Sequence, residues 1–152
     1  MKILIVEDEK SKMTQIINVL KGTIVHEIHI SKCESLLSSI KNIAFNPTYD
    51  LAILDMSMPN YDISADEPSG GLSESFAGRE LMYQMKLRKK LCPIIVVTQY
   101  RSFEKGLIEL DDLDREFKNE FNGYYLGYVY YNAAVDGWTE KLKDIVLSHL
   151  EN

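Results

Sequence analysis

The segment LAILDMSMP, residues 51–59, decides the fold class of this chain of 152 residues. Its first four residues are all apolar, which predicts a central strand covered on both faces. The next residue is Asp55, and a carboxylate at the end of a buried strand costs free energy unless its charge is used. The segment therefore predicts a central strand and, at its end, a candidate functional site.

Short apolar segments alternate with amphipathic helical patterns along the rest of the chain. In the first interval Met13, Ile16, Ile17 and Leu20 recur at helical spacing, and similar patterns fill the later intervals. The predicted strands are residues 2–6, 24–30, 49–54, 93–97 and 124–131, and the last two predicted helices are 107–121 and 137–150. This alternation predicts an α/β fold, a doubly wound five-stranded parallel sheet with helices on both faces.

The polarity of the strands predicts their order. The first, third and fourth segments are almost continuously apolar, whereas segment 24–30 carries His26, Glu27 and His29. A segment with polar residues suits an edge of the sheet, and a continuously apolar one suits its centre. These features predict the flavodoxin-like order 2-1-3-4-5.

Composition limits the class of protein. The length suits one compact domain over residues 1–152, with 45% hydrophobic and 26% charged residues. No stretch reaches the roughly 18 to 20 apolar residues of a membrane span, and the N-terminus has no leader pattern, so we expect a cytoplasmic protein with no membrane partner. A net charge of −6 without a basic stripe argues against nucleic-acid binding. Cys33 and Cys92 are expected to be buried free thiols.

Polar residues follow three of the predicted strands. Glu7 and Asp8 follow the first, Asp55 the third and Thr98 the fourth. In a doubly wound sheet the ligand site lies beyond the carboxyl ends of the strands, so these side chains should converge. Carboxylates that meet would repel one another, and Mg²⁺ prefers such oxygen ligands. A carboxylate nucleophile beside Mg²⁺ indicates phosphoryl chemistry.

Four motifs in combination resemble those of a two-component response-regulator receiver domain. They are VEDE (6–9), LAILDMSMP (51–59), GRELMYQMK (78–86) and PIIVVT (93–98), and the resemblance covers nearly the whole chain. It implies a receiver fold and a phosphoacceptor signalling domain rather than an enzyme.

The resemblance also implies roles for individual residues. Asp55 would accept the phosphoryl group. Glu7, Asp8, Asp55 and the backbone carbonyl of Ser57 would hold Mg²⁺, and Thr98 would bind a phosphoryl oxygen. An aromatic switch residue, whose ring turns inward when the threonine moves, would be represented by Tyr128.

The chain departs from the receiver pattern at the end of the fifth predicted strand. Receivers carry a lysine there that pairs with the phosphoryl group, but this sequence has Tyr131 at that position and no lysine between Lys118 and Lys141. Arg101, three residues after Thr98, is an alternative source of positive charge. The chain is therefore interpreted as an atypical receiver.

Segment 60–75 is a second departure. It separates Asp55 from Gly78 by more residues than receivers usually have there, and its Asp, Ser, Gly and Pro content predicts a long loop without strand or helix. Such an insertion at the border of the site is either a lid or partner surface, or a solvated loop.

Tyrosines gather in the fifth predicted strand. Strict alternation would place Leu126, Tyr128 and Tyr130 on one face and Tyr125, Val129 and Tyr131 on the other. Because aromatic residues with a polar tip are common at interfaces, the surface of helix 107–121, strand 124–131 and helix 137–150 is a candidate docking or homodimer face. The alternative is that these rings only cap the sheet.

Two functions remain open. The first is a single-domain receiver that takes a phosphoryl group from a histidine kinase or phosphotransfer protein and signals by binding a downstream protein. The second is a pseudo-receiver, an adaptor that binds its partner without phosphorylation. A magnesium-dependent phosphatase of the haloacid-dehalogenase kind fits poorly, because it needs an acid at position 57, where this chain has Ser57.

Overall fold

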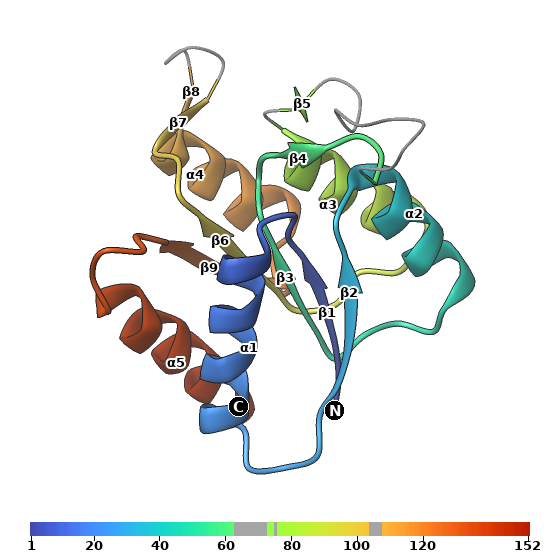
Figure 1. Ribbon diagram of the computed structural model, residues 1–152. Coiled ribbons are helices and arrows are strands. Elements are labelled where there is room, and N and C mark those ends of the chain that lie inside the picture. Colours follow the sequence, from blue (N-terminus) through green and yellow to red (C-terminus); the bar gives the residue numbers. More distant parts are fainter. Residues whose placement is uncertain (63–72, 75, 104–107) are drawn as a thin grey trace.

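The computed structural model describes residues 1–62, 73–74, 76–103 and 108–152. Within these residues, five parallel strands form one sheet in the order β2-β1-β3-β6-β9 (Figure 1). They are β1 (Lys2–Val6), β2 (His29–Cys33), β3 (Leu51–Leu54), β6 (Ile94–Thr98) and β9 (Tyr125–Tyr130). The predicted fold class and strand order are confirmed.

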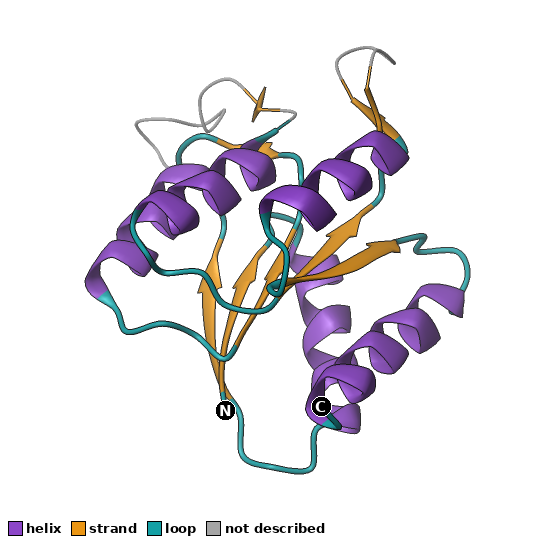
Figure 2. Cartoon of the chain, turned by 180° about the vertical axis from the view of Figure 1, so that it is seen from behind, coloured by secondary structure: helices purple, strands orange, loops and turns teal. Residues whose placement is uncertain are grey.

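In the described part of the chain, five helices cover the two faces of the sheet (Figures 1 and 2). One face carries α1 (Lys10–Thr23) and α5 (Gly137–Leu150), and the other carries α2 (Leu36–Phe45), α3 (Ala77–Leu87) and α4 (Leu110–Glu120). Alternate residues of each strand point to opposite faces, so the sheet has a separate hydrophobic core on each side. All four residues of β3 are buried, as expected for a central strand.

The second strand begins later than the sequence predicted. It was expected at residues 24–30, but β2 is His29–Cys33, and it pairs with β1 from Lys2 with His29 to Val6 with Cys33. Residues 24–28 connect α1 to β2; Ile24 is buried there, whereas Val25 is 92% exposed. The prediction was wrong because β2 is an edge strand that pairs only with β1. The residues that lie opposite β1 therefore determine where β2 begins and ends.

Strict alternation along β9 was also wrong. The register against β6 shifts between Ile94, which faces Tyr125, and Ile95, which faces Gly127. Gly127 has a φ of +136°, a backbone conformation that residues with a side chain rarely adopt. The resulting bulge places Tyr125 and Tyr128 together on the α4 side.

Two short antiparallel pairs lie near the carboxyl ends of the main strands, at the top of Figure 1. They are β4 (Met58–Pro59) with β5 (Ser73–Glu74), and β7 (Ser102–Phe103) with β8 (Ile108–Glu109). The expectation that segment 60–75 contains no strand was wrong for β5. Residues 63–72 and 75 lie outside the described part, and so does most of the predicted lid or partner surface.

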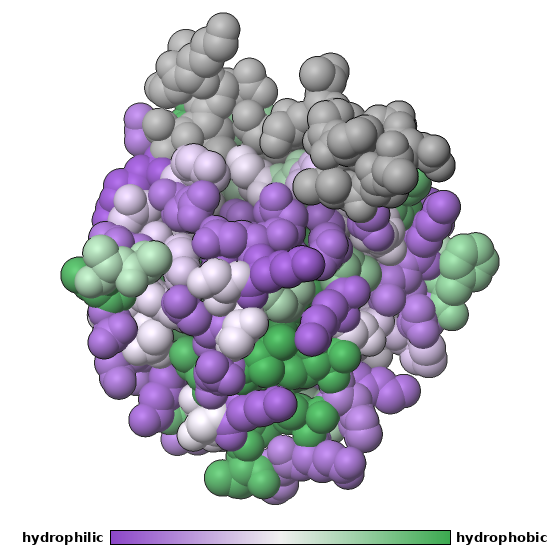
Figure 3. Space-filling view, in the orientation of Figure 1, coloured by the Kyte–Doolittle hydropathy of each residue, from purple (hydrophilic) through white to green (hydrophobic). Residues whose placement is uncertain are grey.

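Cys33 and Cys92 are buried and free, as expected. Within the described ranges, none of the helices combines the length and the apolar character that crossing a bilayer requires. The face shown in Figure 3 is mostly hydrophilic, with a hydrophobic patch over the lower part of α1 and the strands beside it.

Candidate functional site

The loops after β1 and β3 bring three acids together. These strands are neighbours whose last paired residues are Val6 and Leu54, so Glu7 and Asp55 leave the sheet at the same level. The Asp55 amide donates a hydrogen bond to the Val6 carbonyl (3.1 Å). One carboxylate oxygen from each of Glu7, Asp8 and Asp55 lies within 4.8 Å of the other two. The structure thus brings together the three acids that the sequence placed at one site.

The three carboxylates differ in exposure and partners. Glu7 and Asp55 are buried, with only 2% and 4% of their surface exposed to solvent, whereas Asp8 is exposed. Glu7 Oε1 accepts a hydrogen bond from the Glu9 amide (3.0 Å), and Asp55 Oδ1 accepts one from the Met56 amide (2.7 Å). Backbone amides thus orient one oxygen of each buried carboxylate, and Asp8 lies toward solvent.

Lys12 is a functional candidate that the sequence reasoning missed. Its side chain is completely buried, and its Nζ lies 2.6 Å from Glu7 Oε2 and 3.0 Å from Asp55 Oδ2. The signal was its spacing, because Lys12 lies four residues before Ile16 and eight before Leu20, in the buried stripe of α1. A lysine in such a stripe, just after two acids, needs buried partners.

The charges of this cluster are strongly coupled. Burial, assisted by the charge of Asp55, raises the pKa of Glu7 to about 8, although the Lys12 ammonium opposes the shift. Burial alone would lower the pKa of Lys12, but the charges of Asp55 and Glu7 outweigh it and raise that pKa above its usual value. Lys12 is therefore a permanent cation at neutral pH, held against the two buried acids.

A cavity of about 320 Å³ opens beside the acids. Ser57 and Gln99 both line it. Thr98 is completely buried at the end of β6, where its Oγ1 accepts a hydrogen bond from the Tyr100 amide (3.3 Å), and it does not line the cavity. The lining residues are Glu7, Asp8, Glu9, Asp55, Ser57, Met58, Gln99 and Tyr100.

Tyr131 occupies the position that the receiver resemblance assigns to lysine. Its amide donates a hydrogen bond to the Thr98 carbonyl (2.8 Å), and its hydroxyl donates one to Gln15 Oε1 on α1 (3.2 Å). The centre of its ring lies 5.5 Å from Lys12 Nζ and 4.9 Å from the centre of the Trp138 ring. A tyrosine ring packed against α1, directly beside Lys12, therefore fills this position.

Arg101, the alternative cation, lies elsewhere. Its guanidinium carbon is 3.9 Å from the centre of the Tyr130 ring, so it stacks on β9. Among the residues that the structure describes, Lys12 and not Arg101 is the cation that contacts Asp55.

Tyr128 connects β9 with both neighbouring helices. Its hydroxyl donates a hydrogen bond to Asp111 Oδ1 on α4 (3.0 Å), and Lys141 Nζ on α5 lies 4.3 Å from the centre of its ring. The side chain is partly buried. Tyr128 thus lies on the predicted docking face of α4, β9 and α5.

Two backbone features shape the acidic loops. The N-cap of α1 is Glu9, with no side-chain capping bond, so Asp8 does not cap this helix. The first turn of α3 packs on the loop after β3, where the Gly78 amide donates a hydrogen bond to the Met56 carbonyl (3.0 Å). A Cβ on Gly78 would lie 2.2 Å from the Asp55 carbonyl oxygen, so only glycine fits without displacement.

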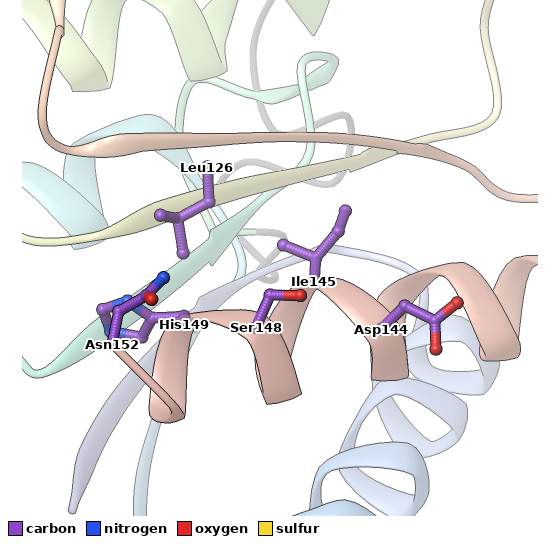
Figure 4. Close-up of a pocket in the computed structure, with 6 residues that line it drawn as sticks. All are labelled: Leu126, Asp144, Ile145, Ser148, His149 and Asn152. Atoms are coloured by element: carbon purple, nitrogen blue, oxygen red, sulfur yellow. The ribbon is translucent and has the colours of Figure 1, made fainter.

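A second cavity, of about 390 Å³, lies between β9 and the C-terminal part of α5 (Figure 4). Leu126 extends into it from β9, and Ile145, Ser148 and His149 come from α5. Its side chains form no cluster of acids or metal ligands like that around Asp55. The acidic cavity is therefore the candidate site.

The architecture matches solved receiver structures. The phosphorylated cyanobacterial phytochrome response regulator RcpA superposes with a TM-score of 0.64 at 20% identity, covering 95% of this chain and 89% of that one. The receiver domain of the sensor histidine kinase PA1611 from Pseudomonas aeruginosa, with magnesium in its active-site cleft, gives 0.61 at 16%, covering 99% and 98%. The chain has the receiver-domain fold. The resemblance seen in the sequence is confirmed at this level.

A sequence relative supports the same assignment. The Detocs response regulatory protein DtcB of Enterobacter cloacae is 28% identical over 151 residues, 95% of this chain and 98% of that protein. No family model matches the sequence. This receiver fold thus has a relative of nearly equal length that is named as a response regulator.

Proposed function

We propose that this chain is an atypical receiver domain of a phosphorelay, in which Asp55 accepts a phosphoryl group. The observation that carries the proposal is the grouping of Glu7, Asp8 and Asp55 within 4.8 Å of one another, on a receiver fold. A buried carboxylate at the edge of an open cavity is accessible to a small phosphorylated group, and its reacting oxygen is oriented by the fold. The domain acts as a signalling acceptor and not as an enzyme.

The chemistry is a phosphoryl transfer to a carboxylate. An Asp55 oxygen attacks the phosphorus of the donor and forms an O–P bond. The bond between phosphorus and the donor atom breaks, and the leaving group keeps its electron pair. With acetyl phosphate the leaving group is acetate, and with a phosphohistidine it is the imidazole of the kinase or phosphotransfer protein. The product is an acyl phosphate on Asp55.

The donor set fits Mg²⁺. The three acids and the Ser57 carbonyl are hard oxygen ligands, and Asp8, the exposed acid, makes no contact with Lys12 that would compete for it. Glu7, Asp8, Asp55 and Ser57 would hold the ion. When bound, Mg²⁺ neutralises charge on the transferring oxygens.

Output is proposed to pass through protein contacts. Tyr128 bridges α4, β9 and α5 through Asp111 and Lys141, so a shift of its ring would alter the surface that these three elements share. We assign the docking of a downstream protein, or of a second copy of the chain, to this face. Thr98 lies two residues after Val96, the last residue of β6 that pairs with β3, and is the proposed relay between the phosphoryl group and the Tyr128 ring.

The adaptor alternative also has an observation in its favour. Lys12 already contacts both Glu7 and Asp55 in the unphosphorylated chain, so these buried acids have a stabilising partner without a phosphoryl group or metal. A pseudo-receiver that binds its partner in this one state would have the same geometry.

Phosphorylation can be tested directly. The protein is incubated with Mg²⁺ and acetyl phosphate, and intact mass is measured. We expect a single phosphoryl adduct in the wild type and none in Asp55→Asn. Asp144→Asn, an exposed acid on α5, is the matched control and should form the adduct normally. An unmodified wild-type mass under these conditions would favour the adaptor.

A further inference from the structure

We propose that Lys12, on α1, is the residue that binds the phosphoryl group on Asp55, in place of the lysine that receivers carry on the last strand. The inference rests on the proposed function, because it requires Asp55 to be phosphorylated. In this proposal Lys12 contacts the phosphoryl group directly, and Tyr131 holds the Lys12 side chain in position.

The position of the Lys12 ammonium is the first observation that supports this proposal. Lys12 Nζ lies between Glu7 Oε2 (2.6 Å) and Asp55 Oδ2 (3.0 Å), so it already contacts the carboxylate that would react. An ammonium has three N–H donors. Beyond these two ion pairs, Nζ has no hydrogen-bond partner among the described residues. One donor therefore remains for a phosphoryl oxygen attached to Asp55.

The buried surroundings of Lys12 are the second observation that supports the proposal. Its side chain is completely buried, so water does not screen its charge. Tyr131 directly follows β9, and the centre of its ring lies 5.5 Å from Lys12 Nζ; its hydroxyl donates a hydrogen bond to Gln15, about one turn further along α1. Tyr131 thus fills the space beside the site and fixes the helix that carries the lysine. Relative to the receiver pattern, the cation is thus on α1, and a bulky residue stands just after β9 where the lysine would be.

The charge that develops during phosphoryl transfer is the third reason to assign this role to Lys12. When an Asp55 oxygen bonds to phosphorus and the donor bond breaks, negative charge moves onto the phosphoryl oxygens next to Asp55. The Lys12 ammonium would neutralise this charge and would transfer no proton. A fixed buried cation at hydrogen-bond distance from the acceptor stabilises such a transition state.

The test compares variants of Lys12 with a control on the same helix. Lys12→Met removes the ammonium and keeps most of the side-chain length, and Lys12→Gln is a second variant that retains a hydrogen-bond donor. Lys10→Met removes an exposed lysine two residues earlier. Each folded variant is incubated with Mg²⁺ and acetyl phosphate, and adduct formation is followed by intact mass. We expect both Lys12 variants to react roughly 100-fold more slowly than the wild type, and Lys10→Met to react normally.

A rescue variant separates charge from packing. In Lys12→Met/Tyr131→Lys the lysine returns to the last strand, and we expect the rate to recover to within about ten-fold of the wild type. If Lys12→Met loses the reaction and the folded double variant does not recover it, Lys12 acts through packing. That result would overturn the inference.

Two further outcomes distinguish the inference from the proposed function. If folded Lys12→Met and Lys12→Gln react at the wild-type rate, the inference is wrong and the proposed function stands. If the wild type itself forms no adduct, both fail together.

Discussion

Lys12 on α1 and Asp55 at the end of β3 form an ion pair in which both side chains are almost completely buried, with 3.0 Å between Nζ and Oδ2. Glu7 shares the same ammonium, so one cation serves two buried acids. A buried charge without its partner is far more costly than an exposed one, so the three side chains depend on one another for stability.

Removing Lys12 alone should therefore destabilise the fold. We expect Lys12→Met to lower the free energy of unfolding by about 3 kcal/mol, which a domain of ordinary stability survives. Asp55→Asn should cost less, because Lys12 keeps Glu7 as a partner. In the double variant the two losses should not add, and the coupling energy from urea unfolding should be about 1 to 3 kcal/mol. Additive losses, within about 0.5 kcal/mol, would mean that the pair contributes no net interaction.

Metal binding should depend on Asp8, the exposed acid of the cluster. We expect Mg²⁺ to raise the melting temperature of the wild type, because an ion that binds only the folded state stabilises it by mass action, about 2.7 kcal/mol at 100 times the dissociation constant. Asp8→Asn removes a ligand without disturbing the Lys12 ion pairs, so the shift should be much smaller. Asp144→Asn should respond as the wild type does, and equal shifts in all three proteins would contradict the predicted site.

Gly78 should not tolerate a side chain. In Gly78→Ala the new Cβ would meet the Asp55 carbonyl oxygen at 2.2 Å and Met56 Cε at 2.5 Å, so the loop after β3 must move. We expect a loss of about 1 to 3 kcal/mol in unfolding free energy, together with slower phosphorylation. Gly22→Ala is the matched control, because nothing lies within 4 Å of its Cβ position in α1. The control should gain about 0.5 to 1 kcal/mol, as alanine favours helix.

The sequence could predict the sheet because hydrophobic runs as strong as those of β1, β3 and β6 suit few other structures. It could also predict that Glu7, Asp8 and Asp55 meet, since parallel neighbouring strands end at the same edge. The β2 boundary was missed because the alternation in residues 24–30 begins before the residues that pair with β1, which are His29–Cys33. The Gly127 bulge was missed because one glycine in a strand does not by itself reveal a register shift.

Lys12 was missed for a different physical reason. Lysine is normally a surface residue, so its place in the buried stripe of α1 has meaning only beside the acids that neutralise it. Those acids come from two strands, and only the fold shows that both lie within 3.0 Å of the same ammonium. Long-range partners of this kind do not follow from local periodicity.

The two thiols should resist alkylation in the folded protein. Burial, assisted by the charge of Asp62, raises the pKa of Cys33 to about 11, and burial with the charge of Asp50 raises the pKa of Cys92 to about 12. A raised pKa lowers the fraction of thiolate, which is the reactive form, so at pH 8 only on the order of one Cys33 in a thousand is ionised, and fewer Cys92.

We therefore expect iodoacetamide to add no label at pH 8 in the native protein within the time that labels both cysteines in urea, where each thiol returns to its ordinary pKa. Raising the pH to 9 should increase the native rate by about ten-fold, because both groups are still far below their pKa values. The measurement is intact mass against time. Native labelling of one cysteine at the urea rate would show that its surroundings open to solvent and that burial does not control its reactivity.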